Sequence, residues 1–125
     1  MQELTHERLV VVDSVLDLVG NTPILKLNAL DTGKCDLFLK LESQNPGQSI
    51  KDRIAITMIE RAEKDGLLKE GVRIIEATAG NTGIALALIA SLKGYDITVV
   101  VPDKMSEGKI AHLRAMGADV IMVRS

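Results

Sequence analysis

The chain has 125 residues, of which 46% are hydrophobic and 26% charged, and its formal net charge is −2. This length suits one domain, and the weakly acidic balance gives no basic surface for a polyanion. One Phe, one Tyr and no Trp leave too few aromatic faces to stack bases, so we expect no nucleic-acid partner.

The first predicted elements lie between residues 37 and 66. The alternation in 37–42 predicts a strand, which Asn45-Pro46-Gly47 ends. Ser49 followed by Asp52 resembles a capping box and predicts a helix that stops at Gly66. The apolar stripe expected on this helix consists of Ile50, Ile54, Met58 and Ala62, with Ile59 beside it.

The alternation of strands and helices then continues to the last residues. Further strands are predicted at 72–77, 97–101 and 119–123, and further helices at 83–93 and between Ser106 and Gly117. Strands that alternate with helices in this way form a parallel sheet with flanking helices. The expected fold class is therefore α/β, a doubly wound three-layer αβα unit.

One predicted helix is unusually apolar. The run Ile84–Ala90 is apolar around its whole circumference, and such a helix must be covered on both sides. Few predicted segments remain to cover the second side. We therefore expect this unit to be incomplete, with a second domain or subunit to cover it.

Several features indicate the cellular setting. Cys35 is the only cysteine, so no internal disulfide can form, which is typical of a reducing compartment. The longest mainly apolar stretch, 83–92, is far below the ~20 residues of a membrane span. His6 and His112 lie far apart and show no metal-ligand spacing. We expect a cytoplasmic protein with no membrane partner and no metal site.

Lys51 falls in the first turn of the helix predicted after Ser49. A cation there opposes the helix dipole at a cost of about 0.3–1 kcal/mol, and broken local rules of this kind mark functional sites. The same field favours the neutral amine, which is the form that attacks an aldehyde. The alternative interpretation is a surface lysine on a solvated helix end.

A second candidate segment, Glu-Ala-Thr-Ala-Gly-Asn-Thr-Gly at 76–83, joins a predicted strand to a helix. Free backbone N–H groups at a helix N-terminus bind anions such as a carboxylate, and Thr78 and Thr82 add hydroxyl donors. Ligands of open α/β sheets bind beyond the carboxyl ends of the strands, where we expect both this segment and Lys51. The alternative interpretation is an ordinary capped turn.

The motifs Asn-Pro-Gly-x-Ser-x-Lys-Asp-Arg at 45–53 and Ala-Gly-Asn-Thr-Gly at 79–83 resemble those of the cysteine synthase and cystathionine β-synthase family of pyridoxal-phosphate (PLP) enzymes. The resemblance implies PLP as cofactor, with Lys51 as its Schiff-base lysine and catalytic base. It implies that the Asn81 side chain donates to a ring oxygen of the cofactor. The residues implied to bind the substrate carboxylate are Thr78, Ala79, Gly80, Asn81 and Thr82.

The reaction implied by the resemblance is β-replacement on serine or an O-acylated serine by a thiol or sulfide, as in sulfur amino-acid metabolism. The resemblance also implies an N-terminal portion of a two-domain enzyme of PLP fold type II, which forms a homodimer. Residues 1–43 would belong partly to the larger domain, and 44–125 would form the small domain. Because the family's glycine-rich phosphate loop has no counterpart among the ten glycines, we expect the 125 residues alone to bind PLP weakly and to be inactive.

Two of the departures from the pattern of the family lie near the candidate site residues. Ala79 stands where many members have Ser, which removes one hydroxyl from the carboxylate loop. Gln48 replaces a common small residue beside the lysine motif. Neither departure removes an essential group.

Three other functions stay open at this point. A truncated domain could act as a non-catalytic interaction module, because exposed apolar surface marks interfaces. A serine/threonine dehydratase uses the same fold, although Ile50 stands where those enzymes carry an aromatic residue. A nucleotide-binding α/β domain would require the fingerprint Gly-x-Gly-x-x-Gly, which the sequence lacks.

Overall fold

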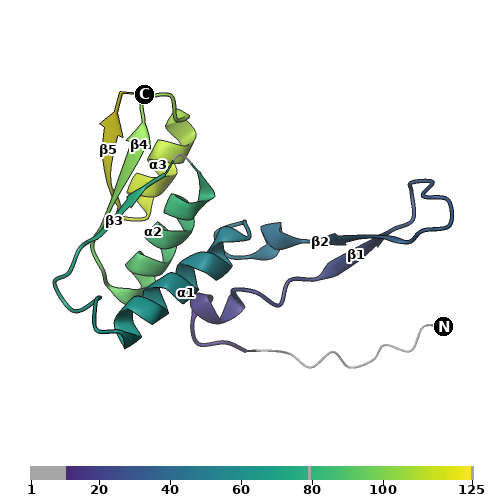
Figure 1. Cartoon of the computed structure of the whole chain (residues 1–125), viewed down its shortest axis with the longest axis horizontal. Coiled ribbons are helices and arrows are strands. Elements are labelled where there is room, and N and C mark those ends of the chain that lie inside the picture. The colour runs from purple at the N-terminus through teal and green to yellow at the C-terminus, as the bar shows by residue number, and fades with distance from the viewer. Residues whose placement is uncertain (1–10, 79, 125) are drawn as a thin grey trace.

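The computed structural model describes residues 11–78 and 80–124 (Figure 1). Two 3-10 helices and an antiparallel hairpin precede a body of three α-helices and a parallel sheet. The elements in chain order are η1 (Val15–Leu18), β1 (Ile24–Leu27), β2 (Leu37–Lys40), η2 (Glu42–Gln44), α1 (Lys51–Lys64), β3 (Ile74–Ala77), α2 (Asn81–Lys93), β4 (Ile97–Pro102), α3 (Glu107–Ala115) and β5 (Asp119–Val123).

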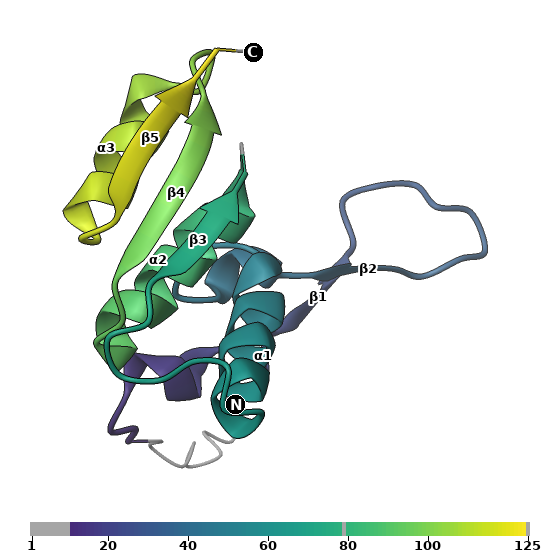
Figure 2. The same cartoon turned by 60° about the vertical axis from the view of Figure 1, so that its left-hand side comes forward.

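The parallel sheet has the strand order β3-β4-β5. β4 is the central strand: Ile97 pairs with Ile74 of β3, and Val99 pairs with Val120 of β5. α2 connects β3 to β4 and α3 connects β4 to β5, and both helices lie on the same face of the sheet (Figure 2). The predicted α/β class, a parallel sheet with flanking helices, is confirmed.

The two faces of this sheet differ strongly in burial. Successive side chains of a strand point to opposite faces, and Val99 and Val101 lie buried beneath the helices. Ile75 and Ile121 point to the opposite face, where their side chains are 70% and 51% exposed. Within residues 11–78 and 80–124, no element covers this apolar face. It is the face on which a third layer would pack.

α2 lies at the centre of the hydrophobic core. Seven of its residues are buried, and Ala85, Ala87 and Ile89 have no exposed surface. α1 packs along one side of α2, while the sheet and α3 contact its other sides. The expectation that α2 would lack cover on its second side is therefore wrong, because α1 supplies that cover. The uncovered apolar surface lies on the sheet instead.

α1 forms where it was predicted, but its buried face is rotated from the predicted stripe and shares only Ile59 and Ala62 with it. Ala55 and Ile59 are buried, whereas Ile50, Ile54 and Met58 of the predicted stripe stay about half exposed. Packed helix axes lie about 8–10 Å apart, depending on the side chains between them. The small side chain of Ala55 permits a close approach of the two helices, and the larger Ile59 is buried on the same face.

The start of α1 also differs in detail from the prediction. Ser49 Oγ accepts a hydrogen bond from Lys51 N–H at 3.1 Å, as a capping serine would. The Asp52 carboxylate, however, accepts from Gly47 N–H, so the predicted capping box is only half formed. Ser106 directly precedes α3, but its side chain makes no capping bond.

β1 and β2 form a hairpin that projects from the body of the protein (Figure 1). Only β2 was predicted by its residue range. Apolar side chains such as Ile24 and Phe38 are exposed on both strands. Lys26 and Asp36 form an ion pair at 2.8 Å across the hairpin. An isolated two-stranded hairpin is marginally stable in water, so this hairpin presents an apolar surface that further packing would stabilise.

Candidate active site

Lys51 is the first residue of α1, and the preceding turn explains why the helix begins there. Gln48 N–H donates to Asn45 C=O at 2.7 Å, which closes a turn around Pro46 and Gly47. The Ser49 hydroxyl then satisfies the N–H of Lys51, a donor that the helix itself leaves without a partner.

Lys51 lies on the side of α1 that faces the core. It precedes the buried Ala55 by four residues and the buried Ile59 by eight, and residues at this spacing share a helix face. Lys51 is half-buried, and its ε-amine makes no hydrogen bond or ion pair with any residue that the structure describes. The amine is therefore available to a ligand, as far as the described residues are concerned.

Asn81 is the first residue of α2, which begins two residues earlier than predicted. Gly80 is the N-cap and no described side chain caps this helix, so backbone N–H groups of its first turn remain available. Thr78 Oγ1 accepts from Gly80 N–H at 3.2 Å and orders the preceding loop. Thr78 and Thr82 are half-buried and Asn81 is exposed; Ala79 lies outside the described residues.

α1 and α2 run in the same direction, which places their first residues at one end of the pair. At the other end, Lys93 Nζ lies 2.7 Å from one carboxylate oxygen of Glu63, and the Tyr95 hydroxyl donates to the second oxygen at 2.9 Å. The helices have 14 and 13 residues and pack side by side (Figures 1 and 2). Lys51 and Asn81 are thus brought to the same end, beyond the carboxyl end of β3.

Two glycines shape the loop that precedes and begins α2. A Cβ atom at Gly83 would lie 2.5 Å from Thr78 Cγ2 and 3.0 Å from Val99 Cγ1, so the helix packs tightly on the end of the sheet. A Cβ at Gly80 would meet no described atom within 4 Å. The first turn of α2 is therefore packed against the sheet at Gly83, while the backbone at Gly80 has no described neighbour on its Cβ side. A ligand can approach the backbone at Gly80.

Asp52, next to Lys51, is fully buried. One carboxylate oxygen accepts from Gly47 N–H, and the other finds no partner among the described residues. Burial raises the pKa of Asp52, and the hydrogen bond from Gly47 offsets part of that increase. The sequence pattern marked Asp52 as a capping residue and gave no sign of this burial.

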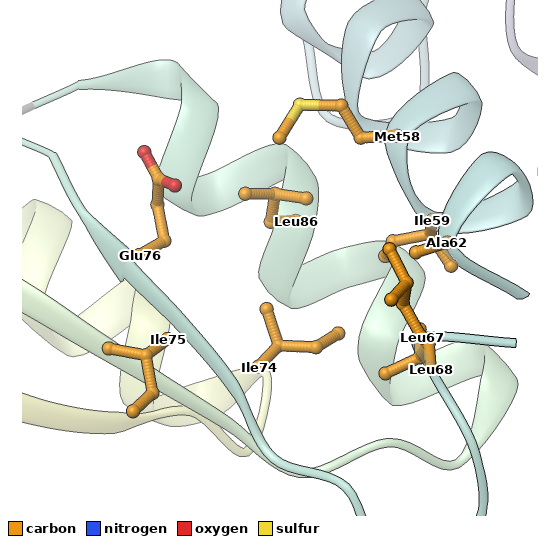
Figure 3. Close-up of a pocket in the computed structure, with 9 residues that line it drawn as sticks. All are labelled: Met58, Ile59, Ala62, Leu67, Leu68, Ile74, Ile75, Glu76 and Leu86. Carbon is orange, nitrogen blue, oxygen red and sulfur yellow. The ribbon is translucent and has the colours of Figure 1, made fainter. Parts of the chain in front are cut away.

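A separate apolar cavity lies between α1, β3 and α2, with a volume of about 190 Å³ (Figure 3). Met58, Ile74 and Leu86 line it, and Glu76 supplies its one charged side chain. Neither Lys51 nor a residue of the 78–82 segment borders this cavity, so it is not part of the candidate site. Among the described residues, no group of His, Cys, Asp and Glu could hold a metal ion, and none of the helices is long and apolar enough to cross a membrane.

Known proteins match the chain over most of its length. A family model described as "Pyridoxal-phosphate dependent enzyme" matches residues 15–125. A cysteine synthase of Staphylococcus aureus is 46% identical over 112 residues, which cover 89% of this chain and 36% of that protein. Cystathionine beta-synthase of Apis mellifera is 48% identical over 114 residues, which cover 89% of this chain and 23% of that protein.

The fold is also similar to that of a solved relative. The crystal structure of cysteine synthase from Entamoeba histolytica matches with a TM-score of 0.90 and 32% identity, over 99% of this chain and 38% of that one. This likeness confirms the predicted fold of PLP fold type II enzymes. The chain spans about a third of the length of the cysteine synthases that it matches.

Proposed function

The chain belongs to the family of pyridoxal-phosphate-dependent enzymes, and from this premise we propose that the whole protein catalyses β-replacement on serine or an O-acylated serine. A thiol or sulfide would be the incoming nucleophile, as in the formation of cysteine or cystathionine. The names of the relatives, cysteine synthase and cystathionine beta-synthase, support this class of reaction. The observation that carries the proposal is the convergence of Lys51 and Asn81 at one end of α1 and α2.

The residues at this end fit PLP by their chemistry. Within the part of the chain that the structure describes, the primary amine of Lys51 and the carboxamide of Asn81 make no hydrogen bond or ion pair. The open space in front of Gly80 leaves room beside the two groups. We therefore propose that Lys51 holds the cofactor through Nζ and that Asn81 orients its ring.

When bound, PLP supplies an electron sink for a carbanion at the substrate Cα. The protein's own groups supply position and proton transfer. Lys51 Nζ would remove and return the proton at Cα, a role for which a positioned amine is suited. The first-turn N–H groups of α2, with the hydroxyls of Thr78 and Thr82, would bind the substrate carboxylate. Ala79 and Gly80 would contribute backbone donors to the same site.

We further propose that residues 44–125 form the small domain of the whole protein, and that residues 1–43 pack partly on its larger domain. The projecting β1–β2 hairpin, with exposed apolar side chains, supports this division. The 125 residues alone are expected to bind PLP weakly, because no glycine cluster among them provides a phosphate loop. We propose a cytoplasmic homodimer as the working form.

Covalent trapping tests the assignment of Lys51 directly. The full-length protein is mixed with PLP, reduced with borohydride and mapped by peptide mass spectrometry. We expect a pyridoxyl adduct on Lys51, its loss in Lys51→Arg, and no change in Lys64→Arg, which alters the other end of the same helix. An adduct on a different lysine, or labelling spread over many lysines, would overturn the assignment.

Substrate pairs then separate the possible reactions. The full-length protein is assayed with O-acetylserine plus sulfide and, separately, with serine plus homocysteine. Turnover of either pair supports β-replacement and names the acceptor. Release of ammonia and a keto acid from serine, without incorporation of the thiol, would favour a dehydratase and reject the proposal.

A further inference from the structure

A compact polar network lies on the side of α1 roughly opposite Lys51; it consists of Thr22, Glu42, Asn45 and Arg53. Arg53 Nε and Nη2 donate to the two carboxylate oxygens of Glu42 at 2.8 and 3.0 Å. The Thr22 hydroxyl donates to the same carboxylate at 2.6 Å, and Arg53 Nη2 lies 3.2 Å from that hydroxyl. The two-point contact between guanidinium and carboxylate fixes direction as well as distance.

Asn45 joins this network to the turn that leads into α1. The residue is 2% exposed, and its Oδ1 accepts from Gly20 N–H at 2.8 Å. Its Nδ2 donates to Glu42 C=O at 2.9 Å and to Ser49 C=O at 3.0 Å. Three segments that are separate in the sequence are therefore held together immediately before Lys51.

The position of Arg53 determines what this network controls. Arg53 follows Lys51 by two residues, which corresponds to about 200° around the helix axis. The contact of Arg53 with Glu42 therefore fixes the rotation of the first turn of α1 about the helix axis. This rotation also sets the direction in which the Lys51 side chain points on the other side of the helix. We propose that the Glu42–Arg53 pair is a positioning element that aims the Lys51 amine at the start of α2.

The pair can fix orientation at neutral pH because both partners are charged there. The Arg53 and Glu42 side chains are 38% and 18% exposed, so solvent screens part of what the pair contributes to the free energy of unfolding. The hydrogen bond from Arg53 lowers the pKa of Glu42 to about 2, so the pair stays ionised at any neutral pH. The contact is thus present whenever the amine is needed.

The test compares Lys51 reactivity in the full-length protein and its variants Glu42→Gln, Arg53→Gln and Arg53→Lys. The rate of pyridoxyl labelling at Lys51 is measured across pH, and urea unfolding is measured in parallel. Glu63→Gln is the matched control, because it breaks an ion pair of similar exposure on the same helix, twelve residues from Lys51. Hydrogen exchange of the amides of 51–54, without PLP, reports on the first turn by itself.

We expect Glu42→Gln and Arg53→Gln to slow labelling of Lys51 by about ten- to a hundred-fold, the cost of a misplacement near 1 Å, and to change its pH profile. Arg53→Lys keeps the positive charge but loses the two-point contact with Glu42. It should therefore label Lys51 faster than Arg53→Gln and more slowly than the wild type. Glu63→Gln should label as the wild type does. Equal labelling in all folded variants, or equal slowing in Glu63→Gln, would overturn the inference.

This inference rests on the proposed function, but the two fail in different ways. Absence of an adduct on Lys51 in the wild type refutes the role proposed for that amine. The positioning claim is then judged by hydrogen exchange, which should be faster for residues 51–54 in Glu42→Gln than in the wild type. Unchanged exchange refutes it. Should Arg53→Gln fail to fold, the same comparison is made with Arg53→Lys.

Discussion

Replacing Gln48 with glycine is expected to stabilise the protein, although Gln48 stands beside the lysine motif. Gln48 has φ +63°, a left-handed conformation that costs a residue with a Cβ atom about 1–2 kcal/mol. Glycine avoids this cost but gives the unfolded chain more freedom, which offsets about 0.4–1 kcal/mol. The exposed side chain loses little packing, and the bond from Gln48 N–H to Asn45 C=O at 2.7 Å is kept. The net expectation is a gain of roughly 0.5–1 kcal/mol.

Urea unfolding of the full-length protein measures this difference, with two variants as controls. Gly47→Ala, one residue earlier, should destabilise by about 1–3 kcal/mol, because the new Cβ would lie 2.5 Å from Asp52 Oδ1. Asn21 also has a positive φ, +45°, but asparagine tolerates this region better, so Asn21→Gly should change stability less than Gln48→Gly. A loss of stability in Gln48→Gly would show that the glutamine side chain contributes more than its backbone strain costs, and would refute this reasoning.

Three further outcomes can be measured by similar means. Gly83→Ala should destabilise the protein by about 1–3 kcal/mol through overpacking, since the new Cβ would lie 2.5 Å from a threonine methyl. Gly80→Ala should have a much smaller effect in the same urea measurement, because its Cβ would meet no described atom within 4 Å. Ile89→Ala should cost about 2–5 kcal/mol in urea unfolding because Ile89 is fully buried, and Leu92→Ala, on the exposed side of the same helix, should cost clearly less. Because the pKa of Glu42 is lowered from 4.5 to about 2 in the folded protein, its stabilising contribution is complete above pH 4.5 and is lost as the pH falls toward 2. When the free energy of unfolding is measured against pH, Glu42→Gln should lack this part of the acid dependence. The same pH dependence in Glu42→Gln and the wild type would contradict the assignment.

The sequence sufficed to predict the elements that follow local rules. Residues 97–101, Ile-Thr-Val-Val-Val, are all β-branched and lie between turn residues, and the structure places β4 there, at Ile97–Pro102. Gly94, with φ +78°, ends α2 where the pattern predicted. Lys51 was placed correctly in the first turn of a helix, because Asn45-Pro46-Gly47 breaks the preceding strand and Ser49 is a residue type that favours a helix start.

Long-range polar contacts could not be predicted in the same way. Arg53 contacts Glu42 and Thr22 across 11 and 31 residues, and no periodicity in the sequence links such positions. The contact face of α1 was predicted only in part, because the spacing of Ile54 and Met58 outweighed the smaller Ala55 in the pattern. The packing partner decides that choice, and the sequence of one helix does not describe its partner.

The bond between Glu63 and Lys93 has a mechanical consequence for the two helices. It ties α1 to α2 at their carboxyl ends, and the side-by-side packing of the two helices fixes the angle between them. Twelve residues separate Glu63 from Lys51, about 18 Å along the helix at 1.5 Å per residue. Over that length, a change of one degree in the angle between the helices would move the first turn by about 0.3 Å. The packing along both helices is therefore what keeps the first turns of α1 and α2 in place, and the bond at the carboxyl ends adds one contact to it.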